Sequence, residues 1–141
     1  MPSAYRTQRR VDFCDTDMAG IVHFSNFFRF MESAEQEFLL SLGLGVSMIF
    51  EGAAIGFPRV SASCDYLRPA HFPDVLDIDV FIHHIGNKSV TYAFEFSKDG
   101  KLLAKGKISS VCCRHTDGHG LESMEIPDTI RHKLKEKRNS V

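Results

Sequence analysis

Residues 15–26 have the sequence DTDMAGIVHFSN, which places two carboxylates, Asp15 and Asp17, and a glycine, Gly20, just before an amphipathic segment. The start of a helix presents unpaired N–H donors and the positive end of the helix dipole, and both favour developing negative charge. A carboxylate at that point can attack a carbonyl, or direct water to it, while the N–H groups hold the carbonyl oxygen. The stretch is therefore typical of acyl transfer or hydrolysis.

The segment that follows has the periodicity of a helix. Apolar residues recur at three- and four-residue spacing at Phe24, Phe27, Phe28, Met31, Ala34, Phe38, Leu39 and Leu42. Charged residues fill the other face at Arg29, Glu32, Glu35 and Glu37. We expect one long helix that has Ser25 or Asn26 as its N-cap and that stops at Gly43.

The remaining chain alternates with a period of two, which predicts strands. The alternating apolar or small residues of four successive strands are Val60, Ala62, Cys64 and Tyr66; Leu76, Ile78, Val80 and Ile82; Val90, Tyr92, Phe94 and Phe96; and Ala104, Gly106, Ile108, Ser110 and Cys112. A first strand ends within residues 11–14, residues 44–58 form a loop with a short helical turn, and residues 98–101 form a hairpin turn. A short amphipathic helix follows Pro127 and leads into a charged, frayed end.

This order of elements, one strand, one long helix and then four strands, predicts an α+β fold with an antiparallel sheet. The chain has 141 residues, which is too short for two domains, so residues 1–141 form one domain. A hydrophobic fraction of 43% and a charged fraction of 25% are typical of a soluble globular protein.

The net charge of the chain indicates which partners it does not bind. A net charge of -1 and a pI near 6.6 argue against nucleic acid or an anionic membrane as the main partner. The N-terminus is polar and basic without an apolar core, so we expect no secretory signal, and no apolar run reaches the length of a membrane span. The four cysteines form no CxxC pair, and we expect them to be reduced, mostly small core residues of a cytoplasmic protein.

A calcium site at the acidic stretch is the first alternative. The pattern Asp-x-Asp-x-x-Gly matches the opening of an EF-hand loop, but the fifth position is Ala19 and the twelfth is Asn26 instead of glutamate. A strand, not a helix, is predicted before it. We therefore do not expect the two carboxylates to be calcium ligands.

Zinc and thiol chemistry are the next alternatives. The histidines at 83–84, and His115 with His119, have no second ligand pair at a suitable spacing for zinc. Cys112 or Cys113 beside His115 could form a thiol nucleophile, but burial in the middle of a strand favours an inert core cysteine. We expect no metal and no cofactor.

Basic residues near the predicted strand ends are Arg59, Arg68, Lys88 and Arg114. Each of them, taken alone, is most simply interpreted as a charge that is exposed to solvent. Lys88 followed by Ser89 at a turn is the best candidate for an anion site, because a lysine and exposed turn N–H groups suit a phosphate. We keep Arg59, Lys88 and Ser89 as candidate substrate-binding residues, and His23 as a residue that lines a pocket at the helix start.

Residues 15–27, followed by the helix and the four strands, resemble the hotdog-fold thioesterases of the 4-hydroxybenzoyl-CoA thioesterase type. The resemblance covers about residues 11–114, and its most specific part is the Asp-x-x-Gly-[Ile/Val]-Val segment before the helix. It implies a five-stranded antiparallel sheet wrapped around one long helix. It also implies that two chains pair to extend the sheet, with active sites at the subunit interface, and therefore a homodimer or homotetramer.

The resemblance also assigns roles to residues. The catalytic carboxylate of the family falls on Asp17, and the helix-start amide that polarises the thioester carbonyl falls on the backbone N–H of Phe24. Basic residues near the turn before the fourth strand bind the phosphates of coenzyme A, which supports Lys88 and Ser89. His23 and Phe24 occupy variable pocket positions, so they bear on the choice of acyl group.

The function implied is hydrolysis of an aromatic or short-chain acyl-CoA thioester to a free acid and CoA, with Asp17 as the nucleophile or as the base that activates water. Two alternatives share the fold. One is a dehydratase acting on acyl-carrier-protein substrates, which needs a histidine and an acid on different segments, a pattern not located in this sequence. The other is a non-catalytic acyl-CoA binding protein.

Overall fold

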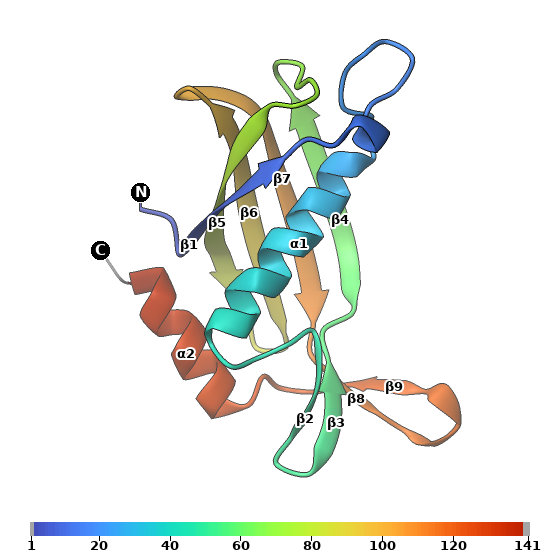
Figure 1. Cartoon of the computed structure of the whole chain (residues 1–141). Helices are drawn as coiled ribbons and strands as arrows, with labels where there is room; N and C mark the ends of the chain where they lie inside the picture. Colours follow the sequence, from blue (N-terminus) through green and yellow to red (C-terminus); the bar gives the residue numbers. More distant parts are fainter. Residues whose placement is uncertain (1, 140–141) are drawn as a thin grey trace.

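The computed structural model of the chain describes residues 2–139 (Figure 1). In chain order the elements are β1 (Tyr5–Arg10), the 3-10 helix η1 (Phe13–Asp15), α1 (Asn26–Ser41), β2 (Ser47–Phe50), β3 (Ala53–Gly56), β4 (Arg59–Tyr66), β5 (Val75–Ile85), β6 (Ser89–Lys98), β7 (Lys101–Val111), β8 (Cys113–His115), the 3-10 helix η2 (Asp117–His119), β9 (Leu121–Ser123) and α2 (Asp128–Asn139). No helix in this described part is both long and apolar enough to cross a membrane.

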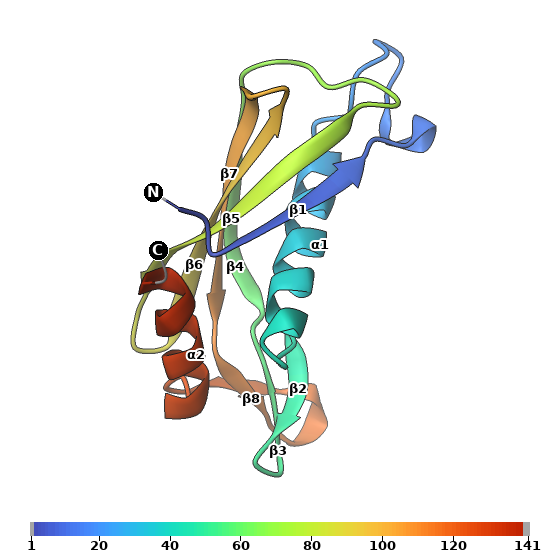
Figure 2. The same cartoon turned by 60° about the vertical axis from the view of Figure 1, so that its left-hand side comes forward.

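A five-stranded antiparallel sheet forms the body of the molecule, in the order β1-β5-β6-β7-β4. The long helix α1 lies along one face of this sheet, as both views show (Figures 1 and 2). The predicted α+β hotdog class, a five-stranded antiparallel sheet with one long helix, is confirmed. The two edge strands are β1 and β4, which decides where the sheet can be extended.

The core lies between α1 and the sheet, and it contains apolar residues from both predicted patterns, the helical spacing of α1 and the alternation of the strands. Phe27, Phe30 and Phe38 of the helix are buried, and the Phe27 ring meets Phe96 of β6 edge-on, with 5.2 Å between ring centroids. Each such phenylalanine stabilises the fold by roughly 1.5–3 kcal/mol through burial. The alternating residues expected to face inward in β5, β6 and β7 are buried as well, which confirms the period-two prediction for these strands.

One helix residue was assigned to the wrong face. Glu35, expected among the exposed charged residues, is only 1% exposed, and its carboxylate accepts a hydrogen bond from the Arg59 guanidinium. A bulge in β4 between Arg59 and Ser61 shifts the register, so that Arg59 lies opposite the buried Ser110 while Val60 is 63% exposed. The bulge therefore brings a cation to the helix-facing side of the sheet, where it balances the charge of Glu35.

The remaining residues of β4 also differ from expectation. Its alternation predicted a half-buried strand, yet Tyr66 is 45% exposed and only Cys64 and Arg59 are even partly buried. The reason is the position of β4 at the edge of the sheet, which leaves one side of the strand without a neighbouring strand among the described residues.

The prediction for residues 44–58 was wrong. These residues form the β2–β3 hairpin instead of a loop with a helical turn, with Glu51 and Gly52 at positive φ in its tight turn. The hairpin joins β8 and β9 in a second, four-stranded sheet at the end of the molecule remote from the start of α1 (Figure 1). Its pairing partner β8 is more than fifty residues away in sequence, so local pattern could not reveal it.

The ends of several elements also needed correction. The first strand ends at Arg10, and residues expected to finish it form η1. The fifth predicted strand breaks at Cys112 into β7 and β8, because the Cys112 N–H donates to the carbonyl of Lys88 (2.7 Å) instead of continuing the ladder. The C-terminal helix continues through the charged run to Asn139 instead of fraying, and residues 140–141 lie outside the described part.

The four cysteines are free thiols. Cys112 and Cys113 are buried, as expected for small core residues, and Cys64 is partly buried. Cys14 is exposed, because it lies in η1 at the surface beside the acidic loop.

Candidate active site

The loop at residues 15–26 is closed on itself by backbone hydrogen bonds. Thr16 and Val22 form an isolated antiparallel bridge, and the Asp17 N–H donates to the carbonyl of Ile21 at 2.9 Å. The Gly20 N–H donates to the carbonyl of Asp17 at 3.0 Å, and Gly20 has φ +81°, a conformation that side chains other than glycine rarely adopt. The loop therefore holds Asp17 in a fixed backbone position before α1.

The two carboxylates of the loop have different surroundings. Asp15 is 6% exposed, and its carboxylate accepts the Asp12 N–H at 2.8 Å. The carboxylate of Asp17 is only partly buried and accepts the Ala19 N–H at 2.9 Å through Oδ1. Its Oδ2 accepts no hydrogen bond from the described residues, so it is available to a ligand. Asp15 thus stabilises the loop, and Asp17 is the carboxylate placed for chemistry.

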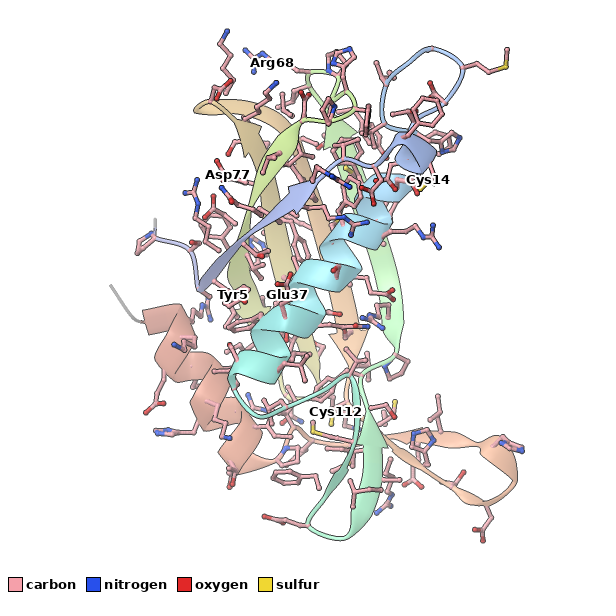
Figure 3. All side chains as sticks on the ribbon, in the orientation of Figure 1. Tyr5, Cys14, Glu37, Arg68, Asp77 and Cys112 are labelled. Atoms are coloured by element: carbon pink, nitrogen blue, oxygen red, sulfur yellow. The ribbon has the colours of Figure 1, made fainter. Side chains whose placement is uncertain are left out.

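A pocket of about 500 Å³ opens beside Asp17. Its lining consists of Asp17, Ile21, Val22, Phe24, Phe27, Tyr66, Leu67, Arg68, Pro69 and Ala70. The lining is mostly apolar and aromatic, with one carboxylate and one guanidinium, which is typical of a site for an organic ligand with a single polar reacting group. Figure 3 shows Arg68 and Cys14 at this same end of the molecule.

The start of α1 supplies a free donor next to this pocket. The carbonyl of His23 accepts the Asn26 N–H (2.9 Å), and the carbonyl of Phe24 accepts the Tyr66 hydroxyl (2.9 Å). The N–H of Phe24 itself donates to no acceptor among residues 2–139. Ser25 is the N-cap, one of the two residues expected in that role, and its side chain makes no capping hydrogen bond. The positive end of the helix dipole and an unpaired N–H therefore lie at the pocket that Asp17 and Phe24 line.

Two of the predicted site residues, Asp17 and Phe24, line the pocket together. His23 lies next to them in sequence but is not part of the lining. Its ring stacks on the ring of Phe24 with 4.6 Å between centroids, and its Nδ1 lies 2.8 Å from the hydroxyl of Ser25. In one chain, His23 therefore supports the helix start from outside the pocket.

The predicted substrate-binding cations lie elsewhere in the chain. Arg59 is bound to Glu35 and lies 3.7 Å from Glu32. Lys88 is exposed in the turn between β5 and β6 and forms no ion pair with any residue in the described range. Its carbonyl is bound to Cys112, which marks the end of the molecule opposite to Arg68 in Figure 3. A single chain thus separates Lys88 from Asp17 by the length of the sheet.

The turn that carries Lys88 and Ser89 is nevertheless well ordered by its neighbours. Arg131 of α2 donates to the carbonyls of Gly86 (3.0 Å) and Asn87 (2.8 Å), and the Gly86 N–H donates to the carbonyl of Ser89 (2.7 Å). An exposed lysine on a fixed turn is suited to an anion.

Sequence reasoning missed the pocket wall at the end of β4 and just after it, which is formed by Tyr66, Leu67, Arg68, Pro69 and Ala70. Arg68 was considered only as a solvated charge, although it donates to the carbonyl of Leu102 (2.7 Å) and lines the pocket. Tyr66 was expected among the alternating residues of a half-buried strand. As the last residue of an edge strand, it instead reaches the start of the helix, where its hydroxyl donates to the carbonyl of Phe24, 42 residues earlier. No group of three or more His, Cys, Asp or Glu side chains within the described chain is placed to hold a metal ion.

The chain is similar to several known proteins. The chain matches the thioesterase-like superfamily over residues 11–134. It is 30% identical, over 135 residues, to a 1,4-dihydroxy-2-naphthoyl-CoA hydrolase of Nostoc punctiforme, covering 96% of this chain and 89% of that protein. It is 28% identical to the 4-hydroxybenzoyl-CoA thioesterase of Pseudomonas sp. strain CBS-3, covering 90% and 94%. A solved gentisyl-coenzyme A thioesterase superposes with a TM-score of 0.78 at 33% identity, covering 90% of this chain and 99% of that structure.

Proposed function

Because the chain belongs to the thioesterase-like superfamily, we propose that it hydrolyses an aromatic or short-chain acyl-CoA thioester to the free acid and CoA. The observation that most supports this proposal is the presence of a free carboxylate oxygen of Asp17 and a free helix-start N–H of Phe24 at one aromatic pocket. The named relatives act on naphthoyl-, benzoyl- and gentisyl-CoA, which all carry aromatic acyl groups. The ring-lined pocket favours the same class of substrate.

The proposed chemistry needs one carboxylate and one donor. The N–H of Phe24 binds the thioester oxygen and stabilises the negative charge that develops on it as the carbonyl carbon becomes tetrahedral. Asp17 either attacks that carbon to form an acyl-enzyme anhydride, which water then hydrolyses, or accepts a proton from the water that attacks. In both routes the carbon–sulfur bond breaks, CoA leaves as the thiol and the acid is released.

We also propose that two chains share the site. Strand β4 ends the sheet, and within residues 2–139 the backbone N–H and C=O groups on its outer side have no partner strand. β4 runs from the end of the molecule that carries Lys88 toward the end that carries the pocket. If two copies of β4 pair in antiparallel fashion about a two-fold axis, the Lys88 end of one chain lies toward the pocket of its partner. This arrangement would bring the candidate CoA-binding turn and the candidate catalytic loop together.

The cellular context is part of the same proposal. The four cysteines are free, including two that are buried side by side in sequence, and this favours a reducing compartment such as the cytoplasm. The partner proposed for the pocket is acyl-CoA, and because the chain has a net charge of -1, the anionic phosphates of CoA need a local cation, for which Lys88 is the candidate.

The test is a thiol-release assay with a panel of acyl-CoA substrates, applied to wild type, Asp17→Asn and Asp15→Asn. We expect Asp17→Asn to lose at least ~10²–10⁴-fold in turnover, because the base or nucleophile is gone, with an unchanged melting temperature. Asp15→Asn is the matched control: it weakens a buried hydrogen bond of the loop, so it should melt earlier but retain much more activity.

Near-wild-type turnover in Asp17→Asn would contradict the mechanism. The same panel separates the alternatives, because neither a dehydratase nor a non-catalytic binding protein releases CoA thiol.

A further inference from the structure

The hydroxyl of Tyr66 connects the sheet to the backbone at the start of α1. It donates to the carbonyl of Phe24 at 2.9 Å, and Tyr66 is the last residue of β4, opposite Ala104 of β7. The ring of Tyr66 meets the buried ring of Phe27 edge-on, with 5.5 Å between centroids. Packing against the helix and pairing with the sheet therefore fix the phenol on both sides.

The backbone of Phe24 has little else to hold it. Its own side chain is 62% exposed and stacks only on the ring of His23, and the N-cap Ser25 makes no side-chain capping bond. The peptide before Phe24 is held by the loop, because the His23 N–H donates to the carbonyl of Asp15 (2.9 Å) and its carbonyl accepts the Asn26 N–H. The peptide after it is held by Tyr66.

The free N–H of Phe24 thus lies between two anchored points, one in the loop and one on the sheet. From this geometry we infer that Tyr66 is a positioning residue for the Phe24 N–H that binds the thioester oxygen, an inference that rests on the proposed function. An oxyanion donor acts only when it is aimed at the place where charge develops, and a displacement of about 1 Å can cost ~10²-fold in rate. Tyr66 also lines the pocket that is proposed to take the acyl group.

The protonation state of the phenol suits this role. Burial, with the Cys64 thiol beside it, raises the pKa of Tyr66 to about 12. The hydroxyl therefore remains a donor throughout the neutral and mildly alkaline range. A positioning role predicts that its removal lowers the rate equally at every pH in that range, whereas loss of a general acid would change the shape of the pH profile.

The test is Tyr66→Phe, which keeps the ring against Phe27 and removes only the hydroxyl. We expect kcat to fall about tenfold, KM to change less than about twofold, and the pH profile to keep its shape. Tyr5→Phe is the matched control, because the Tyr5 ring packs on Phe38 (6.0 Å) away from the pocket and its hydroxyl makes no hydrogen bond with the described residues (Figure 3). Its kinetics should equal those of wild type.

A second readout reports on the carbonyl itself. Benzoyl-CoA labelled with ¹³C at the carbonyl is bound to Asp17→Asn, and the carbonyl stretch is read by isotope-edited infrared spectroscopy. Polarisation by the Phe24 N–H should lower its frequency relative to free benzoyl-CoA, and adding Tyr66→Phe should reverse part of that shift. A tyrosine that only supported the fold would leave the frequency unchanged.

These experiments distinguish a failure of the positioning role of Tyr66 from a failure of the proposed function. If Asp17→Asn is inactive while Tyr66→Phe keeps the wild-type kcat, or if the carbonyl frequency is the same with and without the hydroxyl, the positioning role is wrong and the proposed function stands. If Asp17→Asn turns over normally, the role of Asp17 is wrong, and if wild type releases CoA thiol from no substrate of the panel, the proposed function itself is wrong.

Discussion

Replacing Arg59 with alanine tests whether this cation serves the core or the substrate. In the structure its guanidinium binds the carboxylate of Glu35, which is 1% exposed, and Glu32 lies 3.7 Å away at the surface. Alanine would leave the charge of Glu35 buried without a partner. Breaking a buried ion pair in this way costs 3–5 kcal/mol, and because the Arg59 side chain is 28% exposed we expect a free-energy loss of ~3 kcal/mol. For a domain of this size that lowers the melting temperature by roughly 10 °C.

The pH dependence of this loss follows from Glu35. Burial raises the pKa of the Glu35 carboxyl, and Arg59 opposes that rise, so removing Arg59 raises the pKa further. A carboxyl with a higher pKa in the folded state stabilises the fold below its unfolded pKa, and this contribution disappears as pH rises through the folded pKa. The difference in melting temperature between Arg59→Ala and wild type should therefore be largest at pH 8 and shrink toward pH 5.

Thermal melts at several pH values measure this difference. The control is the double variant Arg59→Ala with Glu35→Gln, which removes the buried charge. It should melt above Arg59→Ala at pH 8, and the gap between these two variants should shrink toward pH 5. Wild-type melting of Arg59→Ala at every pH, together with a raised KM for acyl-CoA, would refute a core role and place Arg59 at the substrate.

Two further predictions concern the substrate and the assembly. Lys88→Ala should raise KM for acyl-CoA far more than it lowers kcat, and the effect should shrink as salt rises because a surface phosphate contact is screened. The exposed Lys101→Ala is the control. If Lys88→Ala leaves KM unchanged at low salt, as the control should, Lys88 does not bind the substrate. Light scattering should give the mass of a dimer or of a dimer of dimers, and activity should fall when dilution splits it; a monomeric mass at concentrations that support turnover would exclude a shared site.

The elements that could be predicted from sequence are those with their own periodicity. Val90, Tyr92, Phe94 and Phe96 alternate and are all buried in a central strand, because a strand with neighbours on both sides buries one whole face. The helix likewise follows from its apolar spacing, and Gly43 after its end has φ +74°.

The features that could not be predicted depend on contacts between distant segments. Glu35 has the spacing of an exposed helix residue, and only the bulge in β4 explains why it is buried with Arg59. The bond from Tyr66 to Phe24 crosses 42 residues, and nothing local to either residue indicates it. At the candidate site, residues 15–26 pointed to Asp17 and to the helix start, but half of the pocket wall comes from Tyr66 at the end of β4 and from residues 67–70 after it.

The close approach of α1 to the sheet at Gly106 has a consequence for the history of the sequence. A Cβ at position 106 would lie 2.5 Å from Sδ of Met31 and 3.1 Å from the backbone oxygen of Ser63. A larger residue at 106 therefore fits only if the flexible end of the buried Met31 side chain moves aside or position 31 becomes smaller, and if the β4 backbone at Ser63 also shifts slightly. The two positions are therefore coupled across 75 residues of chain, and the side chain that is tolerated at 106 depends on the side chain at 31.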